Sequence, residues 1–233
     1  MTTFHIISLF PESLDSYVNS SILKRAQERG IISIKYYNPR DFAVSAKGDS
    51  KVVAKMSYAD RRVDDRPYGG GPGMVMEALP VIRAINKAQG ERRKGKVKGA
   101  KRTKIIFFSP SGKQFTNIVA DSFKKYTDIV LICGRYEGID ARVKKAFPMT
   151  DISIGEYVLT GGEIPAMVLI DTITRRIPGV LGNENSVEER RVAGSDVYTR
   201  PPVIEYKGKK LRVPKILLTG HHKKIDEWKV KGK

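Results

Sequence analysis

The stretch IIFFSPSGKQFTNIVADSFKKYTDIVLICGRYEGIDARVKKAFPMTDISIGEYVLTGG, residues 105–162, decides the fold. Its short apolar runs at 105–108, 129–133 and 152–154 are typical of buried strands. Segments with helical spacing lie between them, at 116–125 and 139–147. Strands that alternate with helices in this way indicate an α/β fold with a mainly parallel sheet and flanking helices.

The pattern continues outward on both sides. We expect further strands over residues 4–9 and 31–37, and helices over residues 14–29, 79–89 and 164–177. Residues 38–73 are polar and rich in turn formers, and they finish in DDRPYGGGPG at 64–73. For this segment we predict a loop.

Changes in composition along the chain predict its domain organisation. The alternating pattern fills residues 1–181, where we expect one α/β domain. Residues 182–199 are charged and irregular, which is typical of a linker or lid. Residues 200–233 are basic, with a predicted turn around Lys207 to Lys209 and a predicted helix over 222–228. There we expect a small, mostly helical appendage.

The chain has a formal net charge of +18, and most of the excess lies in two segments. Residues 91–104 contain eight basic residues against one acidic, and residues 203–233 contain ten against three. Concentrated positive charge attracts a phosphate backbone through counterion release, so we predict a nucleic acid partner. The alternative is a solvated basic loop and tail. A membrane surface is disfavoured because large apolar residues are not interleaved at helical spacing.

The sequence also restricts the compartment and the metal chemistry. Cys133 is the sole cysteine, so no intramolecular disulfide can form and we expect a reducing, cytoplasmic compartment. The sequence has no run of 18 apolar residues and no secretory leader pattern, so we expect neither export nor a membrane span. The adjacent His221 and His222 point to different faces and lack further ligands. We predict no metal site, and nothing in the sequence bears on Mg²⁺.

Three unusual turns follow the strands of the 105–162 stretch. Their sequences are SPSG at 109–112, GRYEG at 134–138 and GEYVLTGG at 155–162. Ligands of open parallel sheets bind beyond the carboxyl ends of the strands. Each turn combines glycine, which lets a ligand approach the backbone, with polar or aromatic side chains. Each alone is typical of an ordinary loop, but three at one sheet edge predict a ligand site.

These turns exclude several common nucleotide sites. None has the GxGxxG spacing of a dinucleotide site, and the chain contains no GxxxxGK[ST] phosphate loop. The glycine run at 69–73 follows DDRP and no apolar strand, so it lacks the context of a phosphate-binding turn. The sequence therefore argues against an NAD enzyme, an NTPase and a methyltransferase of the Rossmann type.

Six motifs occur in the order in which one bacterial family has them. They are DDRPYGGGPG (64–73), CGRYEGID (133–140), IGEYVLTGGEIP (154–165), IPGVLG (177–182), YTRP (198–201) and GHH (220–222). On these motifs the chain resembles the bacterial tRNA (guanine-N1)-methyltransferases of the SPOUT superfamily, from Met1 to about Trp228.

The resemblance implies a homodimer, a C-terminal trefoil knot in the α/β domain and S-adenosylmethionine as methyl donor. It further implies that the loops around the three turns bind this cofactor in a bent form. The residues implied for cofactor binding are Phe108, Ser109, Pro110, Gly134, Tyr136, Ser153, Ile154, Gly155, Glu156, Tyr157, Val158, Leu159, Gly161, Gly162 and Pro165.

The implied reaction methylates N1 of the guanosine that directly follows the anticodon of tRNA. Guanine N1 carries a proton, so a general base must remove it while negative charge builds on O6. The resemblance assigns stabilisation of that charge to Arg175 and binding of the cofactor's ammonium group to Glu137. From the residues alone, Arg175 could equally be a cation at a helix C-terminus, and Glu137 part of a surface salt bridge.

The chain departs from the family pattern at the general base. Counting from Gly182 without gaps puts Arg190 where the family has its catalytic aspartate, and an arginine cannot act as the base. We therefore predict Glu189 as the base, with Glu188 and Asp196 as alternatives. The departure leaves open a non-catalytic RNA-binding homologue. A related knotted methyltransferase that acts on another RNA is the remaining alternative.

The basic segments also differ from the family pattern. Residues 200–233 look shorter than the family's C-terminal tRNA-binding domain, and the basic insert at 91–104 looks longer than usual. We expect the insert and the Lys-rich tail to supply phosphate contacts that a longer domain would make.

Overall fold

A computed structural model describes residues 1–43, 61–90, 102–182 and 196–231. Contacts divide the chain into two compact units, Met1–Val180 and Leu181–Lys233. The predicted roles of residues 182–199 as a linker or lid and of residues 200–233 as a separate RNA-binding domain stay predictions.

Unit 1 is built on a five-stranded sheet in which every pair of neighbours is parallel. The strands are β1 (Thr2–Ile7), β2 (Ile32–Tyr37), β5 (Thr103–Gln114), β6 (Asp128–Ile132) and β7 (Thr150–Ser153), in the order β2-β1-β6-β5-β7. Helices cover both faces of such a sheet, so its strands read as continuous apolar runs. The predicted α/β class and parallel sheet are confirmed, and β6, β5 and β7 are neighbours.

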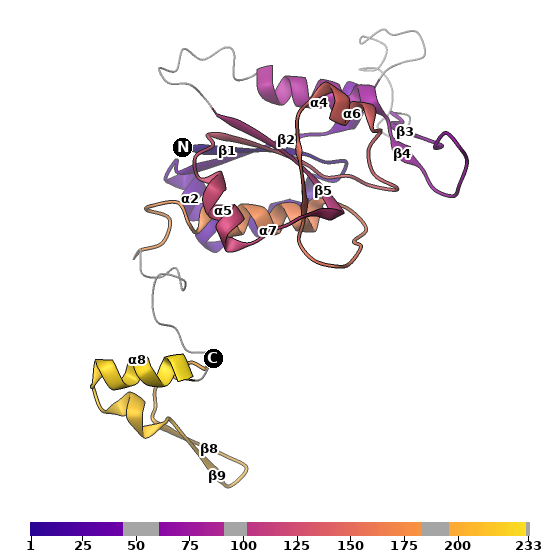
Figure 1. Ribbon diagram of the computed structural model, residues 1–233. Coiled ribbons are helices and arrows are strands. Elements are labelled where there is room, and N and C mark those ends of the chain that lie inside the picture. Colours follow the sequence, from indigo (N-terminus) through magenta and orange to yellow (C-terminus); the bar gives the residue numbers. More distant parts are fainter. Residues whose placement is uncertain (44–60, 91–101, 183–195, 232–233) are drawn as a thin grey trace. The chain divides into compact units, whose positions relative to one another are not determined.

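Helices cover the two faces of this sheet (Figure 1). One face carries α4 (Ala78–Gly90), α6 (Arg142–Ala146) and the 3₁₀ helix η1 (Pro39–Phe42). The other carries α1 (Glu12–Val18), α2 (Ser21–Glu28), α5 (Asn117–Phe123) and α7 (Glu163–Thr174).

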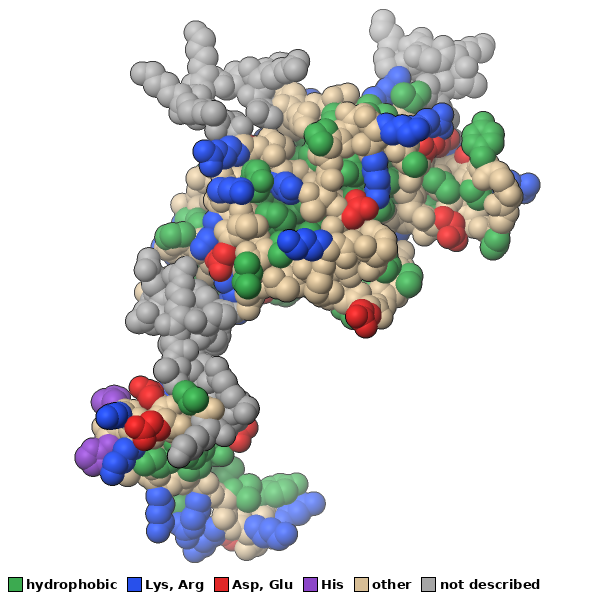
Figure 2. All heavy atoms as spheres, in the orientation of Figure 1, with side chains coloured by type: hydrophobic (Ala, Val, Ile, Leu, Met, Phe, Trp, Pro, Cys, Tyr) green, Lys and Arg blue, Asp and Glu red, His purple; other side chains and the backbone are tan. Residues whose placement is uncertain are grey.

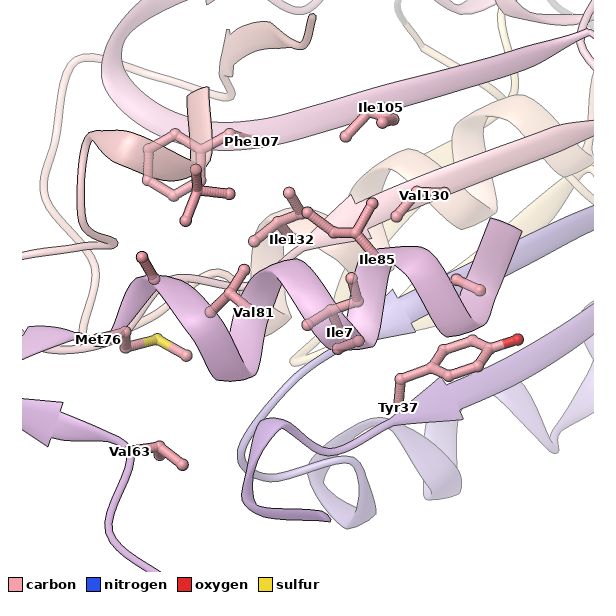
Figure 3. Close-up of a cluster of buried hydrophobic side chains, with 14 of the residues drawn as sticks. Ile7, Tyr37, Val63, Met76, Val81, Ile85, Ile105, Phe107, Val130 and Ile132 are labelled. Carbon is pink, nitrogen blue, oxygen red and sulfur yellow. The ribbon is translucent and has the colours of Figure 1, made fainter. Parts of the chain in front are cut away.

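A buried apolar cluster joins α4 to the sheet. Val81 and Ile85 of α4 lie over Ile7, Val130 and Ile132 of the central strands, and all five are buried (Figure 3). Burying side chains of this size contributes about 1.5–3 kcal/mol each. This buried contact holds α4 on the sheet.

Two elements near the N-terminus differ from their predictions. The single helix expected over 14–29 is two helices, because the chain turns at Asn19 and Ser20 before α2 begins at Ser21. The loop expected over 38–73 contains η1 and also β3 (Asp64–Asp65), which pairs with β4 (Val75–Met76). Propensity patterns do not detect such short elements, which tertiary contacts stabilise. Residues 44–60 lie outside the described residues.

Strand β5 continues beyond the turn that was expected to end it. Phe108 and Lys113 both lie opposite Ile152 of β7, so the four residues between them loop out of the sheet. The strand then resumes as far as Gln114. Gly112 closes this loop, and a Cβ there would lie 2.6 Å from the backbone nitrogen of Ile152.

Unit 2 contains a hairpin, a 3₁₀ turn and a helix. Strands β8 (Val203–Tyr206) and β9 (Lys209–Arg212) pair antiparallel through Lys207 and Gly208, both with positive φ, as a two-residue hairpin turn requires. After η4 (Lys215–Leu218), helix α8 (His222–Lys231) confirms the predicted C-terminal helix. Trp228 packs on Tyr198, with ring centroids 6.4 Å apart. Only a turn was predicted around Lys207 to Lys209, whereas the structure has a complete β-hairpin there.

Candidate active site

A pocket of about 260 Å³ lies at the carboxyl ends of β5, β6 and β7. All three predicted turns contribute to it, as expected from the adjacency of these strands. Every residue predicted to bind cofactor lines it except Glu156, whose side chain is exposed. The lining residues are Phe107, Phe108, Ser109, Pro110, Gly134, Tyr136, Glu137, Gly138, Ile152, Ser153, Ile154, Gly155, Tyr157, Val158, Leu159, Thr160, Gly161, Gly162 and Pro165.

Sequence reasoning missed Phe107 as a member of the site. Phe107 belongs to a buried strand, and its ring carbon lies 3.0 Å from where a Cβ on Gly134 would be. A side chain at Gly134 would therefore press on the Phe107 ring at the pocket floor. The available signal was an aromatic residue in the expected strand at 105–108, directly before a turn that was predicted to contribute to a ligand site.

Backbone atoms of two glycines form one wall of the pocket. A Cβ on Gly162 would lie 2.5 Å from Cα of Cys133, and a Cβ on Gly161 would lie 2.5 Å from Nε of Arg135. The amide of Gly162 donates to the carbonyl of Gly134 at 3.0 Å, which joins the second turn to the third. A ligand there meets bare backbone, the surface that glycine provides.

The second turn places Tyr136 and Glu137 at the pocket. Tyr136 has a φ of +59°, the left-handed region that non-glycine residues rarely adopt, and its ring is half exposed. The amide of Glu137 donates to the carbonyl of Met74 at 3.0 Å. A Cβ on Gly73 would lie 2.7 Å from Oε1 of Glu137. The end of the DDRPYGGGPG motif therefore packs beside the predicted cofactor site.

The thiol of Cys133 does not contribute a nucleophile. Cys133 is fully buried directly before Gly134. Burial, together with the nearby Glu163 carboxylate, raises the pKa of this thiol well above its usual value. It stays protonated at neutral pH, and a thiol is a weak nucleophile.

The three predicted catalytic residues do not all lie at this pocket. Glu137 lines it, whereas Arg175 caps the C-terminus of α7. Pro165 lines the pocket ten residues earlier on α7, a separation of about 15 Å along the helix axis. Glu189, its alternative Glu188 and Arg190 lie outside the described residues, and Asp196 is exposed.

Helix α7 also presents an apolar face to solvent. Ile164 and Val168 are 51% and 39% exposed, and Arg175 follows them at helical spacing. Tyr17 of α1, which is 44% exposed, lies next to α7, and Phe10, which is 38% exposed, packs against Arg135. Burial and the neighbouring Asp171 raise the pKa of Tyr17, so its hydroxyl is neutral at physiological pH.

Two kinds of feature are absent from the described ranges. No helix there has the length and apolar character needed to cross a membrane. In the same ranges, no three His, Cys, Asp or Glu side chains gather as they would around a metal ion.

Comparison with known proteins points to the same family as the six motifs. The family model described as tRNA (Guanine-1)-methyltransferase TrmD matches residues 2–233. The chain belongs to this family. The tRNA (guanine-1)-methyltransferase family is a SPOUT family, so the resemblance inferred from the six motifs is confirmed.

Individual tRNA (guanine-1)-methyltransferases are similar over nearly the whole chain. The tRNA (guanine-N(1)-)-methyltransferase of Clostridioides difficile (strain 630) is 41% identical over 230 residues, which are 97% of this chain and 90% of that protein. Those of Thermomicrobium roseum and Dictyoglomus turgidum are 42% and 40% identical, over 97% and 99% of this chain and 76% and 84% of their own lengths.

Proposed function

We propose that this protein transfers a methyl group from S-adenosylmethionine to N1 of a guanosine in tRNA, the one directly 3′ of the anticodon. The observation that carries the proposal is the pocket formed by three turns at adjacent strand ends in a chain of this family. The trefoil knot and the cytoplasmic location stay predictions from the sequence.

The pocket residues fit S-adenosylmethionine. The glycine wall at Gly161 and Gly162 lets an adenine ring approach the backbone closely, and Tyr136 and Tyr157 supply aromatic faces. Glu137 would hold the ammonium group by charge. When bound, the cofactor supplies an electrophilic methyl group on its sulfonium sulfur.

The acceptor needs two groups from the protein. A carboxylate, by our proposal Glu189, takes the N1 proton as the nitrogen lone pair forms its bond to the methyl carbon. The cofactor would supply the methyl group and would leave as the neutral thioether. Negative charge that develops on O6 of guanine is stabilised by the guanidinium of Arg175.

A homodimer would bring Arg175 to a pocket. The exposed apolar face of α7 begins with Ile164 beside the pocket and leads to Arg175 at the far end. A twofold axis crossing this face would pack two copies of α7 antiparallel and set each Arg175 near the partner's pocket. We propose that each site is completed by its partner chain, with Phe10 and Tyr17 in the interface.

The cationic hairpin of unit 2 favours tRNA as partner. All four residues of β9 are exposed, and three of them are Lys209, Lys210 and Arg212. Figure 2 shows Lys and Arg side chains gathered over this hairpin. Such a surface binds phosphates with a strong dependence on salt. We propose that residues 200–233 act as the RNA-binding domain and residues 182–199 as a linker.

Transfer of a labelled methyl group tests the proposal. Purified protein is incubated with labelled S-adenosylmethionine and a tRNA that carries guanosine after the anticodon. We expect label in that tRNA and none when the guanosine is changed to adenosine. Label in ribosomal RNA alone would favour the other knotted methyltransferase. Cofactor binding without methylation would favour the non-catalytic homologue suggested by Arg190.

Single-turnover kinetics test the choice of base. Alanine is placed separately at Glu188, Glu189 and Asp196, and the rate of methyl transfer is measured with enzyme in excess. We expect Glu189→Ala to slow the chemical step by about 10²–10⁴-fold, the usual contribution of a general base. Equal rates for all three variants would place the base elsewhere.

A further inference from the structure

A buried polar network lies directly behind the pocket. Glu163, the first residue of α7, is 4% exposed. Its Oε1 accepts a hydrogen bond from the Ser8 hydroxyl at 2.6 Å, and its Oε2 lies 3.0 Å from Nε of Arg135. None of these three residues lines the pocket, so the proposed reaction does not use them.

Arg135 connects this carboxylate to the pocket wall. Its Nη1 donates to the carbonyl of Thr160, a lining residue, at 3.4 Å. Its guanidinium also lies over the ring of Phe10, 4.6 Å from the centroid. The amide of Phe10 donates to the Ser8 hydroxyl at 2.9 Å, which closes the network at the end of β1.

The ion pair touches the backbone of the third turn. A Cβ on Gly161 would lie 2.5 Å from both Nε of Arg135 and Oε2 of Glu163. Gly161 also forms an isolated antiparallel bridge with Arg135. The position of residues 160–162 is therefore set by the two charged side chains packed against them.

Stability alone does not explain a charged pair at this place. A buried ion pair contributes little compared with apolar side chains of similar volume, because both charges lose their hydration. Such a pair does fix geometry here, because Oε1 of Glu163 accepts from Ser8, Oε2 lies against Nε of Arg135, and Nη1 of Arg135 donates to Thr160. What it fixes here is the wall of the pocket.

We propose that Glu163 and Arg135, with Ser8, are positioning residues that hold the Thr160 to Gly162 wall in the shape that binds the cofactor. The inference rests on the proposed function and adds residues that act through the backbone they support. Removing the ion pair lets this wall relax, so cofactor affinity falls while the chemical groups stay in place.

Two conservative variants test the proposal. Glu163→Gln keeps the shape of the side chain and one acceptor but removes the charge that faces Arg135. Arg135→Lys keeps a positive charge but cannot reach Glu163 and the Thr160 carbonyl together. The control is Asp121→Asn. This substitution removes the charge of a carboxylate that lies 2.8 Å from Nη1 of the buried Arg176, just beyond the C-terminal end of α7.

Affinity for S-adenosylhomocysteine is measured by calorimetry, and folding is monitored by circular dichroism of the same samples. We expect Glu163→Gln and Arg135→Lys to bind the ligand at least about tenfold more weakly, because the wall of the pocket loses the ion pair packed against it, with Asp121→Asn within about twofold of wild type. In turnover, KM for S-adenosylmethionine should rise, while KM for tRNA and kcat at saturating cofactor stay within about threefold.

Several results would overturn the proposal. One is wild-type affinity in folded Glu163→Gln and Arg135→Lys; another is an equal loss of affinity in the control, which would indicate general destabilisation. If Glu163→Gln does not fold, Arg135→Lys decides between the outcomes. Absence of binding to the wild-type protein would instead contradict the proposed function itself.

Discussion

Individual glycines determine whether the pocket can form. Gly162 lies where any side chain would meet the backbone of Cys133, and its amide bonds to Gly134. A methyl group there cannot be accommodated by rotating a neighbour's side chain, because the atom it meets is an α-carbon. The third turn would have to move away from the second, which separates two walls of the pocket.

We predict that Gly162→Ala lowers affinity for S-adenosylhomocysteine by at least about tenfold and destabilises the fold by roughly 1–3 kcal/mol, the usual cost of overpacking. Calorimetry and chemical denaturation measure the two effects. Gly90→Ala is the control, since no heavy atom lies within 4 Å of a Cβ there. Unchanged affinity in Gly162→Ala would mean that the third turn does not contact the cofactor.

The carboxyl group of Glu77 gives the fold a dependence on pH. Burial, then Asp65 and Asp64, raise its pKa above 4.5. The folded state therefore binds the proton more tightly than the unfolded state, and stability is lost as pH rises through the folded pKa. We predict that Glu77→Gln raises the thermal midpoint at pH 7.

The gain from Glu77→Gln should shrink near pH 4, where this carboxyl is largely protonated in both states. Thermal unfolding at a series of pH values measures it, with the exposed Glu28→Gln of α2 as control. A gain that does not change with pH would show that the substitution acts through packing and not through the charge.

At the level of elements, α7 connects the pocket to the exposed surface. Its first turn carries Glu163 behind the pocket and Pro165 in its lining, and its exposed side carries Ile164 and Val168. Large apolar side chains that are exposed together on one side of a helix are typical of a protein–protein interface. This single helix therefore couples the proposed cofactor site to the proposed dimer.

We predict that Val168→Glu converts a dimer to monomers, because the interface would bury an unpaired charge. Sedimentation velocity measures the mass. Leu79→Glu, a similarly exposed position on α4 across the sheet, should leave the mass unchanged. If Val168→Glu keeps the wild-type mass, the partner packs on another surface.

Mixed dimers test whether Arg175 acts on the partner's site. At a cofactor concentration well below the KM of Gly162→Ala, Arg175→Ala and Gly162→Ala are each expected to be nearly inactive. Dimers formed after mixing equal amounts should regain roughly a quarter of the wild-type rate, because half are mixed and each of these has one complete site. Methyl transfer measured before and after mixing reports the gain. No gain in dimers that have exchanged would place Arg175 in its own chain's site.

At the scale of the whole molecule, the hairpin carries positive charge that the proposed methyl transfer itself does not use. We predict that alanine at Lys209, Lys210 and Arg212 weakens tRNA binding and leaves cofactor affinity unchanged. The slope of log K against log salt should become shallower by up to roughly 0.7–0.9 for each phosphate that the variant no longer neutralises. Fluorescence titrations at several salt concentrations measure the slope.

Alanine at Lys24, Arg25 and Arg29 of unit 1 removes the same number of charges and serves as the control. Equal changes in the two triple variants would show that tRNA responds to net charge, with no preference for unit 2.

The sequence by itself determined the α/β class, most strands and helices, and the three turns of the candidate site. Apolar runs must be buried and parallel strands end at one edge, so the turns after residues 108, 133 and 154 had to meet if their strands were neighbours. The family followed from motif order. These conclusions depend on the order and spacing of residues along the chain, which can be read without knowing the tertiary contacts.

Tertiary structure alone decided which distant residues touch. Ser8, Arg135 and Glu163 come from the ends of β1 and β6 and the start of α7, and no local pattern links positions so far apart. The same holds for Arg175, which the family match implied as catalytic and which the length of α7 separates from its own pocket. Contacts of this kind depend on strand order and helix direction, because side chains meet in space and not along the chain.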